Sequence, residues 1–156
     1  MVKMLDPYYN ISRKDMEDFE TSNSIELTDH YKRFLLKWNG GAPYVGVFMI
    51  SEEGGPTVMN YFYSIGHTDN DLADSLDSFH LRLPEGFISI GDDGVGNAIL
   101  LGISGPHYDQ IYFWDHENES DLDEPDMSNM CFLADNIWAF LDNLYEDESD
   151  DDDDEE

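Results

Sequence analysis

Three short apolar runs separated by turn residues dominate residues 87–117 of this chain. The runs are Phe-Ile-Ser-Ile at 87–90, Ala-Ile-Leu-Leu at 98–101 and Gln-Ile-Tyr-Phe-Trp at 110–114. Gly, Asp, Asn and Pro residues are concentrated in the intervals between them. β-Branched and aromatic residues bounded by such clusters are typical of consecutive antiparallel strands. The segment therefore predicts the central meander of a β-sheet.

Two helices are predicted before this block from their capping residues. Ser12 precedes a short helix over residues 13–20, with Asp15 at the capping-box position. Thr28 is the expected N-cap of a second helix, which ends at residues 39–41 because Asn and Gly tolerate the left-handed conformation. Its apolar residues recur at three- and four-residue spacing, as expected of a core helix. They are Tyr31, Phe34, Leu35 and Trp38.

The remaining segments predict a mixed architecture. Strands are expected over residues 44–50 and 58–65, separated by a turn at 51–56, because Gly54-Gly55-Pro56 is not expected to continue a strand ladder. A helix capped within residues 68–70 is expected to continue to Phe79. A last amphipathic helix is predicted from about 128 to 145 by the apolar positions Cys131, Leu133, Ile137, Phe140, Leu141 and Leu144. This order indicates one α+β domain over residues 1–145, built around an antiparallel sheet.

Negative charge is distributed unevenly along the chain. The formal net charge is −29, yet six of the seven basic residues lie within the first 37 positions, and Arg82 is the only later one. Residues 146–156 are ten acids and Ser149, which predicts a disordered tail because like charges repel. Without them the chain still carries about −19. Such a chain is expected to repel nucleic acid and anionic membranes and to attract basic partners, or simply to be more soluble.

Three features bear on the cellular compartment. No stretch approaches the roughly 18–20 apolar residues of a membrane-spanning helix. The N-terminal residues lack the apolar run of a signal peptide. The single cysteine, Cys131, cannot form an internal disulfide. Together these features predict a protein of the reducing cytoplasm.

Four blocks of the sequence resemble the SUKH superfamily, which is named for yeast cell-wall-synthesis regulators and bacterial toxin-immunity proteins. The first is Leu-Thr-Asp-His-Tyr-Lys-Arg-Phe-Leu at 27–35, followed by Asn-Gly-Gly at 39–41. The others follow in the family's order at 88–97, 111–117 and 133–141. Thr28 stands where the family usually has Pro, and either residue suits the start of a helix.

The resemblance implies an α+β fold with a curved, mainly antiparallel sheet flanked by helices. It also implies that the protein neutralises a cognate toxin, often a nuclease encoded nearby, as many bacterial members do. The shared residues belong to turns and core, and they include no catalytic motif. They therefore indicate a fold rather than a particular function.

The glycine-rich segment at residues 91–97, Gly-Asp-Asp-Gly-Val-Gly-Asn, invites two functional interpretations. As a phosphate-binding loop it has the wrong glycine spacing and no lysine. As a calcium loop it lacks the alternating acidic positions and the closing glutamate. A bulged hairpin in which Gly and Asn supply positive φ is the simpler interpretation.

Other candidate catalytic or metal sites have no better support. Asp-His-Glu at 115–117 offers three ligand types, but adjacent strand residues point to alternate faces, and His107 is the only nearby histidine. Cys131 is expected in the buried stripe of the last helix, where a thiol is usually inert. Asp92 and Asp93 could pair as general acid and base, but nothing indicates a pocket. We therefore expect no enzyme, no metal and no cofactor.

Tyrosines interspersed with acids are a more promising feature. Aromatic anchors within an acidic rim suit a surface that binds a basic protein. The alternative is that these tyrosines are ordinary strand aromatics facing the core, as is also possible for Tyr112. The candidate partner-binding residues are Tyr44, Tyr61, Tyr63, Asp92, Asp93, Tyr108, Asp109, Asp115 and Glu117.

Two functions remain after these exclusions. The first is a non-enzymatic immunity protein that binds and neutralises a basic, nuclease-type toxin domain. The second is a regulatory scaffold or adaptor that mediates protein–protein interactions, as the yeast members of the superfamily suggest. A single tight partner encoded nearby would favour the first function, and weak binding to several proteins would favour the second.

Overall fold

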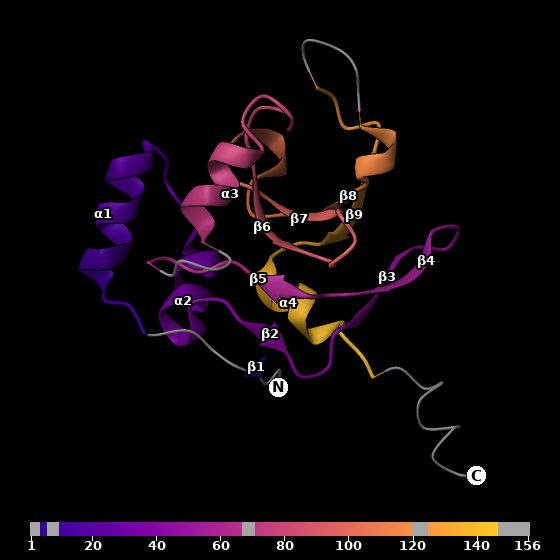
Figure 1. Cartoon of the computed structure of the whole chain (residues 1–156), viewed down its shortest axis with the longest axis horizontal. Helices are drawn as coiled ribbons and strands as arrows, with labels where there is room; N and C mark the ends of the chain where they lie inside the picture. Colours follow the sequence, from indigo (N-terminus) through magenta and orange to yellow (C-terminus); the bar gives the residue numbers. More distant parts are fainter. Residues whose placement is uncertain (1–3, 6–9, 67–70, 120–124, 147–156) are drawn as a thin grey trace.

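The computed structural model describes residues 4–5, 10–66, 71–119 and 125–146 of the 156-residue chain. These residues form one α+β domain with antiparallel sheets, which confirms the predicted fold class (Figure 1). The helices are α1 (Arg13–Asn23), α2 (Asp29–Trp38), α3 (Leu72–Ser78), α4 (Ile137–Asp142) and the 3-10 turns η1 (Gly105–His107) and η2 (His116–Asn118). The strands are β1 (Met4–Leu5), β2 (Ala42–Pro43), β3 (Val47–Ser51), β4 (Gly55–Val58), β5 (Tyr61–Phe62), β6 (Phe87–Asp92), β7 (Ala98–Gly102), β8 (Ile111–Trp114) and β9 (Met130–Ala134).

The main sheet has five antiparallel strands in the order β5-β6-β7-β8-β9. Its centre is the predicted three-strand meander, in which Ile88 lies opposite Leu101 and Leu101 lies opposite Ile111. The register of β6 and β7 shifts between Ser89 and Gly91, which is the irregularity of a β-bulge. Turn residues at short intervals were sufficient to predict these strands, because each strand pairs with its neighbour in sequence.

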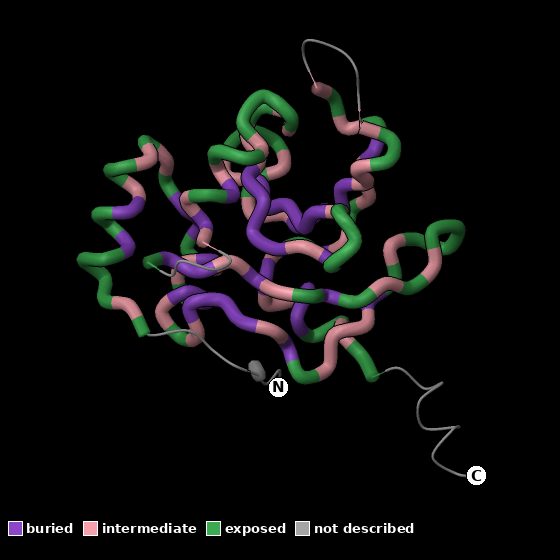
Figure 2. Tube along the Cα trace, in the orientation of Figure 1, coloured by how far each residue is buried: buried purple, intermediate pink, exposed green. Residues whose placement is uncertain are grey.

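Both faces of this sheet are covered. One face packs on α2, α4 and β3 in the main core, where Ile99 and Phe113 meet Phe34 and Phe140. The other face carries a smaller cluster of Ala98, Leu100, Tyr112 and Trp114. We call this second side the outer face. Burial is accordingly concentrated in the sheet strands, with few exposed positions in β6, β7 and β8 (Figure 2).

The helix capped by Thr28 matches its prediction. The hydroxyl of Thr28 accepts a hydrogen bond from the backbone N–H of Tyr31 at 3.4 Å. Asn39 ends the helix with φ of 50°, and its side chain exchanges two hydrogen bonds with the backbone of Ile65, at 3.0 and 2.9 Å. The first helix also has its predicted capping box at Ser12, but it continues to Asn23 instead of ending near residue 20.

The last predicted helix is wrong in its first half. Residues expected to open a helix near 128 form the strand β9, which pairs with β8, and only Ile137–Asp142 are helical. Asn136 separates the two elements by accepting a hydrogen bond from the backbone N–H of Ala139 at 3.0 Å. Cys131 therefore lies half-buried in a strand and not in a helical stripe. Its spacing to Leu133 is that of a strand, and the helical spacing begins only at Ile137.

Smaller corrections concern the segment before α3. Strand β4 begins at Gly55 and includes Pro56, which lies opposite Met49, although this tripeptide was expected to form only a turn. The ladder has just two strands, so Pro56 sits on an edge where its missing N–H costs little. The predicted strands 44–50 and 58–65 shrink to β3 and β5. The predicted cap at 68–70 lies outside the described residues, and Asp71 is the N-cap of α3.

Glu146, the first residue of the predicted tail, is exposed. The rest of that tail lies outside the described residues.

Candidate partner-binding surface

The turn between β6 and β7 is organised by a buried aspartate. The carboxylate of Asp93 accepts hydrogen bonds from the backbone N–H groups of Val95 and Asn97, at 3.0 and 3.1 Å, and from the side-chain amide of Asn97 at 2.8 Å. Gly94 and Gly96 have φ of 83° and 101°, which confirms the predicted glycine-rich hairpin turn. Asn97 was expected to share this conformation but does not; its side chain instead donates a hydrogen bond to Asp93.

Asp92 is equally engaged with its neighbours. Its carboxylate accepts hydrogen bonds from the amide side chain of Asn60 at 3.0 Å, the hydroxyl of Tyr63 at 3.1 Å and the backbone N–H of Gly94 at 3.0 Å. The two aspartates thus shape the turn with their side chains. They add negative charge to the surface, but a partner would meet carboxylates that already accept internal hydrogen bonds.

Two of the candidate tyrosines flank this turn. Tyr61 lies in β5 directly opposite Asp92 of β6. Tyr63 follows β5 and is half-buried, and its burial, together with the nearby Asp92 carboxylate, raises the pKa of its hydroxyl far above the usual range. Tyr63 therefore stays a neutral hydrogen-bond donor to Asp92 at any physiological pH.

The acids at 115 and 117 lie beside the same turn. Asp115 caps η2 by accepting a hydrogen bond from the backbone N–H of Glu117 at 3.0 Å. The backbone N–H of His116 donates to the side-chain oxygen of Asn97 at 3.1 Å, so η2 is attached to the β6–β7 turn. Six predicted residues therefore lie at the same end of the sheet, beside the β6–β7 turn. They are Tyr61, Tyr63, Asp92, Asp93, Asp115 and Glu117.

The other three predicted residues lie elsewhere. Tyr44 is exposed between β2 and β3, and Tyr108 is exposed after η1. Asp109 has φ of 73°, and its carboxylate lies 2.5 Å from Nδ1 of His30, at the start of α2. The structure does not bring these three side chains to the β6–β7 turn, so the nine predicted residues do not make one continuous surface.

The outer face of the sheet carries an aromatic cluster that Tyr112 joins. The Tyr112 ring packs edge-on against Phe87 of β6 and Phe132 of β9, with ring centroids 5.5 and 5.7 Å apart. Its hydroxyl donates to the side-chain oxygen of Gln110 at 3.0 Å. Tyr112 is therefore a core residue, as the alternative interpretation of the strand tyrosines held.

One arginine links the two loops beside this face. Arg82, in the loop after α3, donates hydrogen bonds from Nε and Nη2 to the carboxylate of Glu119 at 3.1 and 2.9 Å. Its guanidinium also lies 4.9 Å from the ring centroid of Phe79 and 5.1 Å from that of Trp114. The hydrogen bonds that Arg82 donates to Glu119 raise the pKa of the guanidinium above its ordinary value, so the group stays charged. The sole basic residue beyond Lys37 is thus paired within the protein.

Two exposed apolar side chains near this face were missed from the sequence. Leu81 is 76% exposed and Phe132 is 51% exposed. Leu81 could have been noticed as an apolar residue between His80 and Arg82 in a turn. Phe132 was hidden by the wrong helix, since only strand alternation places it opposite the buried side of β9.

The described residues give no support to a metal centre. No three His, Cys, Asp or Glu side chains among them are grouped so that they could hold a metal ion. Asp115, His116 and Glu117 form a capped 3-10 turn, and His107 lies near Tyr112 instead of these residues.

The match to a protein-family model gives the relationship to known proteins. The model of the SMI1 / KNR4 family (SUKH-1) matches residues 10–143. The chain belongs to this family. No curated protein matched the sequence. The resemblance to the SUKH superfamily is thus confirmed over most of the chain.

The SUKH blocks of the sequence lie at structural positions. Thr28 and Asn39 cap α2, the 88–97 block forms β6 and its turn, and the 133–141 block joins β9 to α4 through Asn136. These residues hold the fold together by capping and packing. They do not by themselves define a binding site. In the described part of the chain, no helix is long and apolar enough to cross a bilayer.

Proposed function

We propose that this SUKH-family protein is a non-enzymatic immunity protein that binds and neutralises a basic, nuclease-type toxin domain. The observation that carries the proposal is the absence of compensating positive charge beyond α2. Only Arg82 is basic after Lys37, and its guanidinium is already paired with Glu119. The remaining acids therefore present an acidic surface to any partner.

Physical chemistry links such a surface to this kind of partner. A domain that binds phosphate groups carries a basic cleft, and a surface dense in carboxylates is electrostatically complementary to it. Long-range attraction between the two would accelerate their encounter and would weaken with added salt, because ions screen charges beyond about 8–10 Å. The toxin domain would then be inhibited by occlusion of its basic cleft alone, without any catalytic step by the immunity protein.

Co-purification with the product of the neighbouring gene tests the proposal. The two proteins are expressed together with a tag on one of them, and the complex is isolated at low and at high salt. We expect a one-partner complex whose association rate falls several-fold when salt is raised. Failure of the chain to bind anything encoded nearby would contradict the proposal.

The regulatory scaffold is the second candidate, supported by the match to the SMI1 / KNR4 family model. It differs in the number of partners it requires. A scaffold binds several unrelated proteins weakly, whereas an immunity protein binds one protein tightly. The same co-purification distinguishes the two by the identity and number of the captured proteins.

A further inference from the structure

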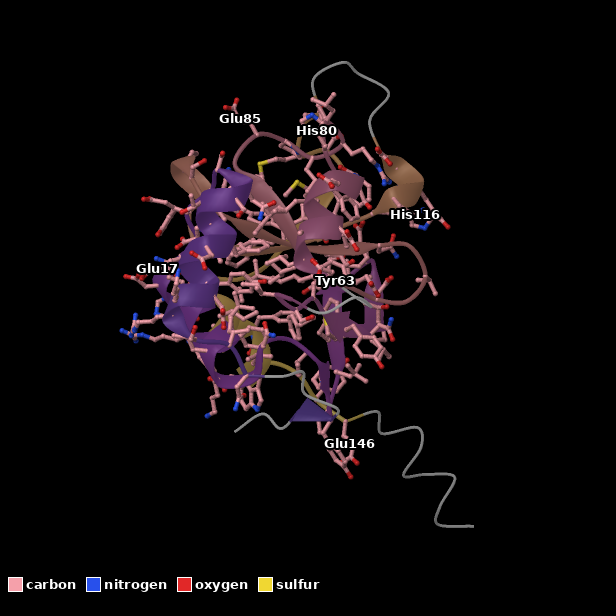
Figure 3. The ribbon with its side chains drawn as sticks, turned by 60° about the vertical axis from the view of Figure 1, so that its left-hand side comes forward. Glu17, Tyr63, His80, Glu85, His116 and Glu146 are labelled. Atoms are coloured by element: carbon pink, nitrogen blue, oxygen red, sulfur yellow. The ribbon has the colours of Figure 1, made fainter. Side chains whose placement is uncertain are left out.

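An open groove of about 590 Å³ lies between the loop after α3 and the start of β6. Its inner wall is formed by Leu76 of α3 and by Phe87 and Ile88 of β6, while Leu81 and Leu83 stand at the loop side. His80 and Glu85, which also line it, lie at the same end of the molecule (Figure 3). None of the nine residues predicted from sequence lines this groove.

Leu81 occupies a position that its side chain does not favour. Its φ is 66°, in the left-handed region that non-glycine residues other than Asn and Asp rarely adopt. Its side chain is also 76% exposed, so little apolar burial offsets that cost. A strained backbone that presents a large apolar side chain to solvent at the mouth of a groove is typical of a functional position.

Acidic residues lie around the groove, and no Lys or Arg is among the described residues that line it. Glu85 lines it, Asp126 follows the lining residue Pro125, and Asp74 and Asp77 are exposed on α3. The seven residues of α3 span only about 10 Å, so these acids lie within a screening length of the groove. Arg82, in the same loop as Leu81, is the only Lys or Arg after Lys37, and its charge is paired with Glu119.

We infer that this groove receives an apolar side chain from a lysine- and arginine-rich segment of a partner protein. The apolar walls would bury the inserted side chain, with Leu81 covering it, while the surrounding acids pair with the flanking basic residues. This inference rests on the proposed function for the identity of the partner. The charge and shape of the groove specify its chemistry independently: one apolar anchor flanked by positive charge.

Two synthetic peptides of equal charge test the anchor. One is Arg-Arg-Phe-Arg-Arg, and the other has Ser in place of Phe. Dissociation constants are measured by fluorescence titration against the full chain, and the bound site is mapped by NMR shifts of backbone amides. Burial of one phenylalanine side chain predicts binding about tenfold tighter for the first peptide. The shifts are expected at Leu81, Glu85 and Phe87.

The variant Leu81→Asn separates binding from folding. Asn tolerates the left-handed conformation better than Leu, so the urea midpoint is expected to stay unchanged or to rise. The preference for the phenylalanine peptide should nevertheless be lost. Val95→Asn is the matched control, because Val95 is also an exposed apolar residue (68%) and lies in the β6–β7 turn, away from the lining of the groove.

A second pair of variants tests the charge. Glu85→Lys should weaken binding of both peptides several-fold, whereas Glu53→Lys, at the exposed tip between β3 and β4, should change it far less. Equal affinity for the two peptides, or a phenylalanine preference that survives Leu81→Asn, overturns the groove inference.

The outcomes also separate this inference from the function on which it rests. If the peptides do not discriminate but the chain still neutralises the product of the neighbouring gene, the groove is wrong and the immunity function stands. If the peptides discriminate but no such neutralisation occurs, the groove stands and the immunity function is wrong.

Discussion

The guanidinium of Arg82 and the carboxylate of Glu119 form a two-point contact across the loops beside the outer sheet face, at 3.1 and 2.9 Å. The two residues come from different segments, one after α3 and one after η2. Because the guanidinium also covers the rings of Phe79 and Trp114, the contact connects the loop that carries Leu81 to the end of β8. The contact therefore holds in place the loop whose residues Leu81 and Leu83 line the groove.

Replacing Arg82 by Lys should lower the free energy of unfolding by about 1 kcal/mol, since Lys keeps the charge but loses the planar fork and the ring contact. Urea denaturation measures the change. Lys14→Ala is the control, because the exposed Lys14–Asp18 pair should contribute only a few tenths of a kcal/mol. An equal decrease in the free energy of unfolding of the two variants would show that the Arg82–Glu119 contact stabilises the fold no more than an exposed ion pair does.

The buried carboxylate of Asp93 should matter far more than the exposed one of Glu117. Asp93→Ala removes the acceptor for Val95 and Asn97, and we expect a loss of about 2–3 kcal/mol in urea denaturation. Glu117→Ala should stay within about 0.5 kcal/mol of the wild type. If Asp93→Ala unfolds at the same urea concentration as the wild type, the carboxylate is not what organises the turn.

The buried Tyr31 and the half-buried Tyr63 should make the protein sensitive to alkali. Burial raises the pKa of Tyr31 and of Tyr63 well above the ordinary value of 10.0. Above pH ~10 the unfolded chain loses these protons while the folded chain keeps them, so unfolding becomes more favourable as pH rises. The free energy of unfolding should be insensitive to these groups below pH ~10 and should fall above it.

The variants Tyr31→Phe and Tyr63→Phe check this cause and should differ at pH 7. The Tyr31 hydroxyl is buried without a hydrogen-bond partner among the described residues, so its removal should leave stability unchanged or raise it by about 1 kcal/mol. Tyr63→Phe loses the bond to Asp92 and should lower stability by about 1 kcal/mol. An alkaline loss that is unchanged in the double variant would exclude these two groups as its source.

The acidic residues at 146–156 should act mainly on the rate of association with a basic partner. Ten of these eleven residues are acidic, so their deletion removes long-range attraction. We expect a several-fold lower association rate at low salt and an unchanged dissociation rate in stopped-flow measurements. A Gly/Ser segment of the same length is the control for chain length. A raised dissociation rate after deletion would instead indicate direct contact.

The fold was predictable from sequence where the signals are local. The meander in residues 87–117 needs only turns and alternation, and α2 needs only its caps at Thr28 and Asn39. Strand β9 was missed because its apolar positions were taken together with those of α4, although the two-residue spacing of Cys131 and Leu133 is that of the strand that pairs with β8. β8 and β9 are separated in the sequence by a long polar segment, so the local pattern does not reveal that they pair.

The candidate surface was less predictable for a related reason. Six of the nine predicted residues lie at the end of the sheet beside the β6–β7 turn, where Tyr61 and Asp92 are direct partners in the sheet. Asp109 was drawn away to His30 of α2 by tertiary packing. The positive φ of Leu81 was not predictable, because sequence suggests that conformation for Gly or Asn but not for Leu.

The most direct test of the proposed immunity function is a growth assay. Cells express the basic product of the neighbouring gene, with and without this chain, and their survival is measured. The account predicts that cells producing the neighbouring protein alone stop growing and that co-expression of this chain restores growth. Restoration should need binding only, and so it should rise with the amount of this chain until the two proteins are equimolar. Growth arrest that persists with this chain present in excess would contradict the account.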